Sequence, residues 1–229
     1  MCGVIGISMQ EANLDLVREI FKQSMIRGKH ATGLTYVSEG VLKTHKEGIS
    51  ADNFLDTFDL DQVVDTDGSV TMIGHIRYST SDLRYNQPFS NDDLSIVHNG
   101  VISQEDPSTW VYETETANDS ELILRAREFG ETPLNFFRPA SMAVVELHKD
   151  KTLIGYRNEA RPLWYSAVEG GIIFTSTKDI ALRSGWIQRR SLRLTYPLKC
   201  SMFTEYRYKN LTLEVVKFDH EWEVEDLQC

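Results

Sequence analysis

Cys2 is the residue of this 229-residue sequence whose position permits the most distinctive chemistry. It directly follows Met1, and cysteine is small enough for the methionine aminopeptidase of most cells to remove a methionine before it. Removal of Met1 gives Cys2 both a thiol and a free α-amine. Because such an amine titrates at about pH 8 and a thiol at about pH 8.5, the amine can serve as the base for the thiol. The alternative is an inert cysteine that begins a buried strand.

Attack of a thiolate on an amide requires donors for the oxyanion, and the tripeptide His98-Asn99-Gly100 provides candidates at the end of a predicted strand. The side-chain amide of Asn99 and the backbone amide of Gly100 together would form an oxyanion hole. Glycine also lets the backbone approach a reacting carbon closely. The alternative reading is an ordinary Asn-Gly turn.

Arg77 and Asp119 have the charges that a small amino-acid substrate requires. Arg77 lies where a predicted strand passes into a loop, and its planar guanidinium suits a carboxylate in bidentate geometry. Asp119 precedes a predicted helix and could meet an α-ammonium group. The alternatives are a structural ion pair for Arg77 and a helix cap for Asp119.

These residues need a framework of strands, which the first half of the chain predicts. Residues 3–9 form a short apolar strand, and Asn13 can cap a helix that ends near Gly28. The apolar face of that helix carries Leu14, Val17, Ile20, Phe21 and Met25. A hairpin at 32–37 and 41–46, a short helix with loop at 51–65, strands at 70–77 and 93–98 and a loop at 79–92 follow.

The second half predicts one helix from about Asp119 or Ser120 to Gly130, and then a run of strands. The strands are expected at 140–147, 152–156, 163–167 and 171–175, with a helix at 178–183 and several β segments within 191–217. This order predicts an α+β fold in which antiparallel sheets carry helices on their outer faces. Residues 218–229 read as an acidic C-terminal extension.

Composition favours one cytoplasmic globular domain. The hydrophobic content is 41%, and no apolar run is long enough to predict a membrane span or a signal peptide. A net charge of −10 argues against nucleic-acid and anionic-lipid partners, which require a basic face. The cysteines Cys2, Cys200 and Cys229 are odd in number and irregularly spaced, so we expect a reducing compartment without a disulfide framework.

Several short motifs occur in a fixed order along the chain. They are Met1-Cys2-Gly3-Val4-Ile5-Gly6-Ile7, Arg27-Gly28-Lys29-His30-Ala31-Thr32-Gly33-Leu34, Gly74 to Thr80, Asn86-Gln87-Pro88-Phe89, His98-Asn99-Gly100, Asn118-Asp119-Ser120-Glu121, Arg161-Pro162-Leu163-Trp164 and Phe174 to Leu182. Together they resemble the glutaminase domain of class II glutamine amidotransferases. The resemblance covers about residues 2–205. It looks closest to glutamine phosphoribosylpyrophosphate amidotransferases, with glucosamine-6-phosphate synthase more distant.

The resemblance implies a fold and a role for each matched residue. The fold would be the four-layer αββα sandwich of N-terminal nucleophile (Ntn) hydrolases. Cys2 would be the nucleophile, with its amine as general base, and Asn99 and Gly100 would form the oxyanion hole. The remaining roles concern substrate binding: Arg77 and Thr80 would hold the α-carboxylate of L-glutamine, Asp119 its α-amino group, and His98 would line the pocket.

The chain departs from the family pattern at His30, where the family usually has aspartate, so the role of that acidic position does not transfer. His30 could instead be a structural hydrogen-bonding residue. His75 and His98 flank the proposed site, but their separation matches no zinc motif, so we expect no metal. His75 is expected to be structural. The sequence also has no phosphate-binding loop, and we expect no cofactor.

These observations predict a glutaminase domain over residues 2–217 that hydrolyses L-glutamine to glutamate and ammonia through a thioester on Cys2. Because no synthase segment follows in this sequence, we expect the ammonia acceptor to act in a separate synthase polypeptide. The oligomeric state stays open. One alternative is an Ntn amidohydrolase that cleaves γ-glutamyl or other amides without transfer. The other is a non-catalytic regulatory or assembly protein on the same fold.

Overall fold

The structure, a computed structural model, describes residues 1–79, 85–187 and 195–218, and two β-sheets form its centre. In this part of the chain the first sheet has seven strands. In spatial order they are β11 (Leu198–Lys199), β9 (Trp164–Val168), β10 (Gly171–Thr175), β1 (Gly3–Met9), β4 (Val70–Arg77), β2 (Ala31–Ser38) and β3 (Val41–Glu47). Every pairing described within it is antiparallel.

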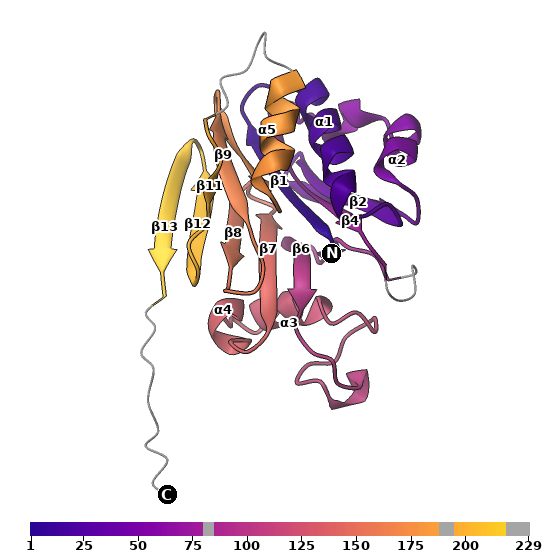
Figure 1. The fold of residues 1–229 in the computed structure, drawn as a ribbon, viewed down its shortest axis with the longest axis vertical. Helices are drawn as coiled ribbons and strands as arrows, with labels where there is room; N and C mark the ends of the chain where they lie inside the picture. Colours follow the sequence, from indigo (N-terminus) through magenta and orange to yellow (C-terminus); the bar gives the residue numbers. More distant parts are fainter. Residues whose placement is uncertain (80–84, 188–194, 219–229) are drawn as a thin grey trace, which may run out of the picture.

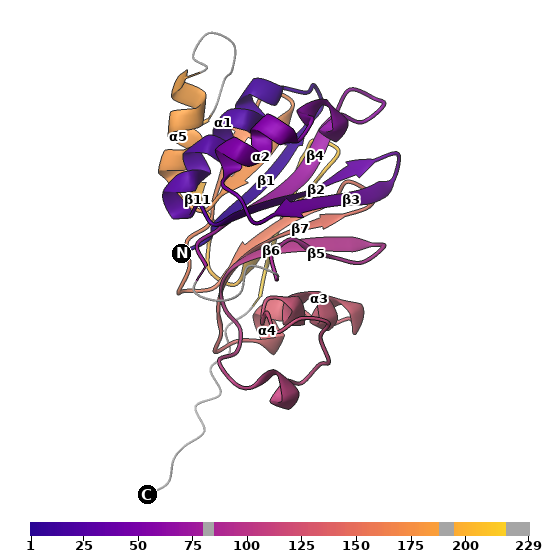
Figure 2. The ribbon, with the colours of Figure 1, turned by 90° about the vertical axis from the view of Figure 1, so that its right-hand side faces the viewer.

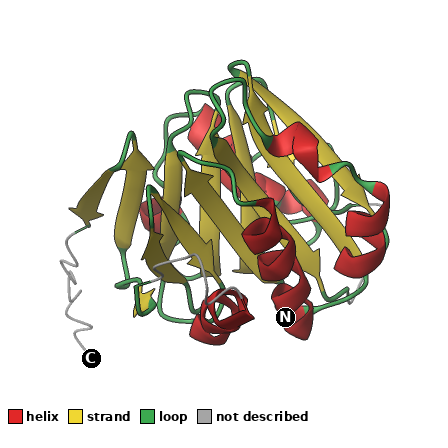
Figure 3. Ribbon diagram, turned by 90° about the horizontal axis from the view of Figure 1, so that it is seen from above, coloured by secondary structure: helices red, strands yellow, loops and turns green. Residues whose placement is uncertain are grey.

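The second sheet lies against the first and has six strands in the described residues. Their order is β13 (Thr212–Lys217), β12 (Thr204–Lys209), β8 (Leu153–Arg157), β7 (Ser141–His148), β6 (Leu94–Val101) and β5 (Phe89–Ser90). These pairings are also antiparallel. Figure 3 shows the strands of both sheets running side by side beneath the helices.

Helices cover the outer face of each sheet (Figures 1 and 2). The first sheet carries α1 (Leu14–Ser24), α2 (Ala51–Thr57) and α5 (Lys178–Ile187), and the second carries α3 (Glu121–Glu128) and α4 (Pro133–Phe136). The result is a four-layer αββα sandwich, and the predicted fold class is confirmed. None of the described helices is both long and apolar enough to cross a membrane.

The central strand β1 shows why the sequence forms layers. Its side chains alternate between two buried faces, so the strand reads as a continuous apolar run. Ile5 and Ile7 pack under the helices, whereas Val4 faces the second sheet. On the helix side, Asn13 caps α1 by accepting a hydrogen bond from Leu16 N at 2.9 Å. The predicted helix is confirmed, and Met25 lies in the short 3₁₀ turn that follows it.

Other predicted elements match the structure to within a few residues. The segment 51–65 contains α2 and a 3₁₀ turn, Leu60–Val63, and the later helix extends to Ile187. The segment 191–217 contains β11 and the hairpin of β12 and β13, although residues 188–194 lie outside the described part. Three elements were not predicted: the two-residue strand β5 inside the expected loop, the 3₁₀ turn Pro107–Thr109 and the short helix α4.

The strand register brings the first predicted site residues together. Gly3 pairs with Ile76 and Val4 with His75, so continuing the register places Cys2 opposite Arg77. Strand β6 of the second sheet packs beneath β1 and β4 and carries Asn99. Figure 2 shows the amino terminus at one side of the molecule, at the level where the two sheets meet.

Candidate active site

Cys2 is half-buried immediately before β1, and its backbone nitrogen is held from the opposite sheet. Cys2 N donates to Asn99 Oδ1 at 3.2 Å, a contact that joins residues 97 positions apart. Arg27 Nε donates to the carbonyl oxygen of Cys2 at 3.3 Å. Met1 is 62% exposed, so the residue that must be removed to free the Cys2 amine lies at the surface.

Asn99 presents two different groups to the site. Its Oδ1 receives the Cys2 hydrogen bond, whereas its Nδ2 is buried and has no hydrogen-bond partner among the described residues. A buried amide donor without a partner is costly, and such donors require an explanation. The predicted strand end therefore holds a free N–H group beside the nucleophile.

Gly100 is required by close packing. A Cβ atom at this position would lie 1.8 Å from the carbonyl oxygen of Ser141 and 2.6 Å from His98 Nε2. No other residue fits without separating β6 from β7. The tripeptide is therefore part of a strand, β6, and not the isolated Asn-Gly turn that the sequence also permitted.

Arg77, a buried residue that is 7% exposed, ends β4. Its Nη1 donates to the backbone oxygen of Tyr85 at 2.9 Å and to Asn86 Oδ1 at 2.7 Å. These bonds to neutral acceptors fix the orientation of the guanidinium group. Gly28 makes room for this strand end, because a Cβ there would lie 2.4 Å from the backbone of Arg77.

Asp119 does not act as the cap of α3. The N-cap of that helix is Ser120, whose side chain makes no capping bond. Instead, Asp119 Oδ2 accepts hydrogen bonds from the backbone nitrogens of Ile102 at 2.5 Å and Ser103 at 3.2 Å. Both bonds fall on one oxygen of the carboxylate and tie the loop after β6 to the start of α3.

His98 is 1% exposed and neutral near physiological pH. Burial, the main cause, lowers its pKa to about 4, although the charge of Asp119 acts in the opposite direction. Its Nε2 lies 3.2 Å from Ser141 O and its Nδ1 lies 2.8 Å from Ser120 Oγ. Because a carbonyl only accepts, Nε2 carries the proton and Ser120 donates to Nδ1. The ring thus connects β6, β7 and α3.

A cavity of about 250 Å³ brings most of the predicted site together, although Asn99 is not among its lining residues. The predicted residues that line it are Cys2, Arg77, His98, Gly100 and Asp119. Thr80 lies outside the described residues. The described residues contain no group of three or more His, Cys, Asp or Glu that could hold a metal ion.

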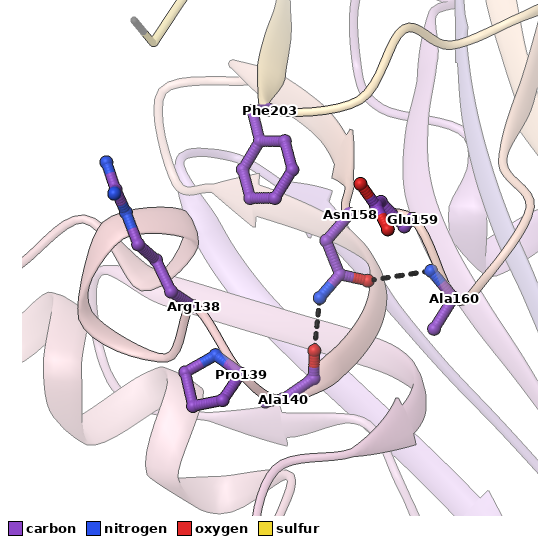
Figure 4. A pocket seen from close by; sticks show the side chains of 7 residues that line it. All are labelled: Arg138, Pro139, Ala140, Asn158, Glu159, Ala160 and Phe203. Carbon is purple, nitrogen blue, oxygen red and sulfur yellow. Dashed lines mark hydrogen bonds between the residues drawn. The ribbon is translucent and has the colours of Figure 1, made fainter. Parts of the chain in front are cut away.

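A larger cavity of about 450 Å³ lies elsewhere. Figure 4 shows it, with Arg138, Asn158 and Phe203 among the residues around it. None of the predicted site residues lines this cavity. The smaller cavity is therefore the candidate active site, because it combines the nucleophile with groups that can bind a substrate.

Gln87 is a structural centre of the site that sequence reasoning left without a role. Its Oε1 accepts from His98 N at 2.6 Å, and its Nε2 donates to His98 O at 3.1 Å and to Ser120 Oγ at 3.0 Å. The motif Asn86-Gln87-Pro88-Phe89 signalled this position, although not its partners. His30, which replaces the family aspartate, accepts a hydrogen bond at Nδ1 from Ser79 N at 2.8 Å.

No protein-family model matches the chain, and no curated protein sequence matches it. Solved structures, in contrast, do match the chain. A glutamine phosphoribosylpyrophosphate amidotransferase from B. subtilis, complexed with ADP and GMP, superimposes with a TM-score of 0.75 at 18% identity over 95% of this chain and 49% of its own. A structure described as the allosteric regulatory enzyme of purine biosynthesis gives a TM-score of 0.74 with the same identity and coverage.

A third solved structure, a glutamine aminotransferase class-II domain protein from Silicibacter pomeroyi, gives a TM-score of 0.56 at 10% identity. The match covers 95% of this chain and 99% of that one. At these identities the likeness establishes a shared fold. The chain spans about half the length of the first two proteins, at 49% of each. The fold expected from the class II glutamine amidotransferase resemblance is thus confirmed.

Proposed function

We propose that residues 2–217 form a class II glutamine amidotransferase domain that hydrolyses L-glutamine to glutamate and ammonia. The observation that carries this proposal is the arrangement of the two polar atoms of the Asn99 side chain. Its Oδ1 holds the nitrogen of Cys2, while its buried Nδ2 has no partner among the described residues. A side chain that holds the nucleophilic residue and also supplies an oxyanion donor suits attack on a carboxamide.

The proposed reaction begins once Met1 has been removed. The Cys2 amine takes the thiol proton, and the thiolate attacks the γ-carbonyl carbon of glutamine. Asn99 Nδ2 and the backbone nitrogen of Gly100 donate to the oxyanion. The amine then passes its proton to the departing nitrogen, which leaves as ammonia. Water attacks the resulting γ-glutamyl thioester with the amine as base, so glutamate and the thiol are restored.

Substrate binding would use the two charged groups of the cavity. The guanidinium of Arg77 would hold the α-carboxylate, with Thr80 as a further proposed contact. The carboxylate of Asp119 would face the α-ammonium. His98, neutral and fixed by Ser120 and Ser141, would line the pocket and keep Gly100 in place.

We further propose that the ammonia passes to a separate synthase polypeptide. The solved phosphoribosylpyrophosphate amidotransferase supports transfer of the ammonia, because that protein is described as an amidotransferase and this chain matches 49% of its length. Transfer would take place in the cytoplasm, as the cysteine usage of the sequence suggests. No cofactor is required by the proposed steps.

Substrate comparison tests the proposal. Purified protein whose mass shows that Met1 is absent should release equal amounts of glutamate and ammonia from L-glutamine, and Cys2→Ala should release neither. Faster cleavage of large γ-glutamyl conjugates would favour the amidohydrolase alternative. No turnover of any of these amides by the processed protein would favour a regulatory or assembly role.

A further inference from the structure

His75 is a buried side chain of the cavity to which the reaction above assigns no role. It lies on β4, is 1% exposed and lines the same cavity as Cys2 and Arg77. Its Nε2 is buried and has no hydrogen-bond partner in the described part of the chain. Because buried polar atoms are almost always paired, an unpaired one in a cavity wall indicates a missing ligand atom.

The strand register places His75 near the reacting end of the cavity. Val4 pairs with His75, and continuing that register sets Cys2 opposite Arg77. Paired residues of an antiparallel sheet share a face, as do residues two apart on one strand. Val4 packs between the sheets, so His75 points into the same layer as the nucleophile, two residues deeper along the strand. Two residues along a strand correspond to about 7 Å.

The ring of His75 is neutral, and its free nitrogen is an acceptor. Burial, followed by the charges of Arg77 and His98, lowers its pKa to about 3. A hydrogen bond to the backbone of His98 acts in the opposite direction, as expected when the ring donates to a carbonyl. Because Nε2 is the nitrogen without a partner among the described residues, we assign the ring proton to Nδ1 and the lone pair to Nε2.

A lone pair in this position discriminates between an amide and an acid. The γ-carboxamide of glutamine has an N–H₂ group that can donate to it, whereas the γ-carboxylate of glutamate has only acceptors. The α-ammonium is the other donor of glutamine, but it has a carboxylate partner available in Asp119. We propose that His75 Nε2 accepts a hydrogen bond from the γ-carboxamide nitrogen and sets the preference for glutamine over glutamate. This inference rests on the proposed function.

The kinetic test compares His75→Leu, which removes the acceptor, with His75→Gln, whose side-chain oxygen can replace it. The readout is the ratio of the KM for L-glutamine to the inhibition constant of glutamate. Loss of one hydrogen bond predicts about a tenfold rise in this ratio for His75→Leu. Substantial recovery is expected in His75→Gln. His45→Gln, at a surface position 46% exposed in its side chain, is the matched control and should leave the ratio unchanged.

A second measurement does not depend on a His75 variant that folds. In ¹⁵N-labelled Cys2→Ala protein, which binds without turnover, the Nε2 resonance of His75 should shift on addition of L-glutamine and stay in place with glutamate. Equal shifts with both ligands, no shift with glutamine, or an unchanged constant ratio in a folded His75→Leu protein would overturn the inference. If the wild-type protein hydrolyses glutamine in the same experiments, the proposed function holds even when the inference about His75 fails. If the wild-type protein is inactive, both the proposed function and the inference fail.

Discussion

At the scale of single residues, Asn99 links the nucleophile to the stabilisation of charge. One side chain accepts a hydrogen bond from the Cys2 nitrogen at its oxygen and has a buried N–H₂ group without a partner among the described residues. Sequence reasoning could name Asn99 as an oxyanion donor but not its contact with Cys2, because that contact joins strands of different sheets. Sequence reasoning also could not predict the unpaired nitrogen of His75, because its surroundings include residues of both sheets.

The two functions of Asn99 can be separated by Asn99→Asp. The substituted side chain retains an oxygen acceptor for the Cys2 nitrogen but loses the N–H₂ donor. We expect kcat for glutamine hydrolysis to fall by about 10²–10³, as is typical when one oxyanion donor is removed. KM should change much less, because the donor acts on charge that develops in the transition state. Steady-state kinetics on processed protein provide the measurement. A fall confined to substrate affinity would argue against the oxyanion role.

At the scale of elements, the strand end of β6 determines whether the site forms. Gly100→Ala places a Cβ against Ser141 O, where only 1.8 Å is available, and forces β6 away from β7. Overpacking of this kind predicts a loss of about 1–3 kcal/mol in the free energy of unfolding, together with loss of activity. Denaturant unfolding measures the loss. Gly48→Ala is the control, because nothing lies within 4 Å of a Cβ at that position.

The element scale also shows the limits of sequence reasoning. Strands such as β1 and β4 and the helix α1 were predicted because their apolar periodicity and the Asn13 cap are local signals. The strand β5 and the helix α4 have two and four residues, too few for a periodic pattern, and they exist through tertiary contacts. Local patterns predict no helix or strand within residues 102–118, although Asp119 ties the first of them to α3.

The C-terminal boundary illustrates the same limit. Phe218 was assigned by sequence to the acidic extension, yet it packs against the cluster under α3 and α4, and its backbone nitrogen donates to Phe203 O at 2.9 Å. The acidic composition of residues 218–229 predicts an extension without core contacts. The contact of Phe218 could not be predicted, because its partner Phe203 is 15 positions away in the chain. The remaining residues, 219–229, lie outside the described part.

At the scale of the whole molecule, buried titratable groups make stability depend on pH. Burial alone would raise the pKa of Glu146, but the charge of Arg127, the nearby His148 ring at 3.5 Å and a hydrogen bond from Tyr156 lower it to about 2 from a usual 4.5. Burial lowers the pKa of His75 to about 3 and of His98 to about 4, both from 6.5. In each case the unfolded chain binds more protons than the native protein in the interval between the two values.

These shifts predict that the contribution of the three groups to the free energy of unfolding is at its maximum above about pH 6.5. This contribution falls on acidification, first because the histidines bind protons on unfolding and, below about pH 4.5, because Glu146 does so as well. The Glu146 contribution is on the order of 3 kcal/mol, from the difference between 4.5 and about 2. Denaturant unfolding at a series of pH values measures the dependence. Glu146→Gln should lower stability at neutral pH but flatten the curve below pH 4.5. An equally steep curve in that variant would contradict this assignment.

In the proposed reaction, Cys2 with its own amine free forms a thioester with glutamine. The most direct test of this step is mass spectrometry of protein mixed with L-glutamine and quenched in acid within a turnover. We predict a γ-glutamyl adduct on the peptide that begins at Cys2, absent in Cys2→Ala and absent from the peptide that carries the buried Cys200. Hydrolysis of glutamine at the full rate by protein that retains Met1, or an adduct at any other residue, would contradict this mechanism.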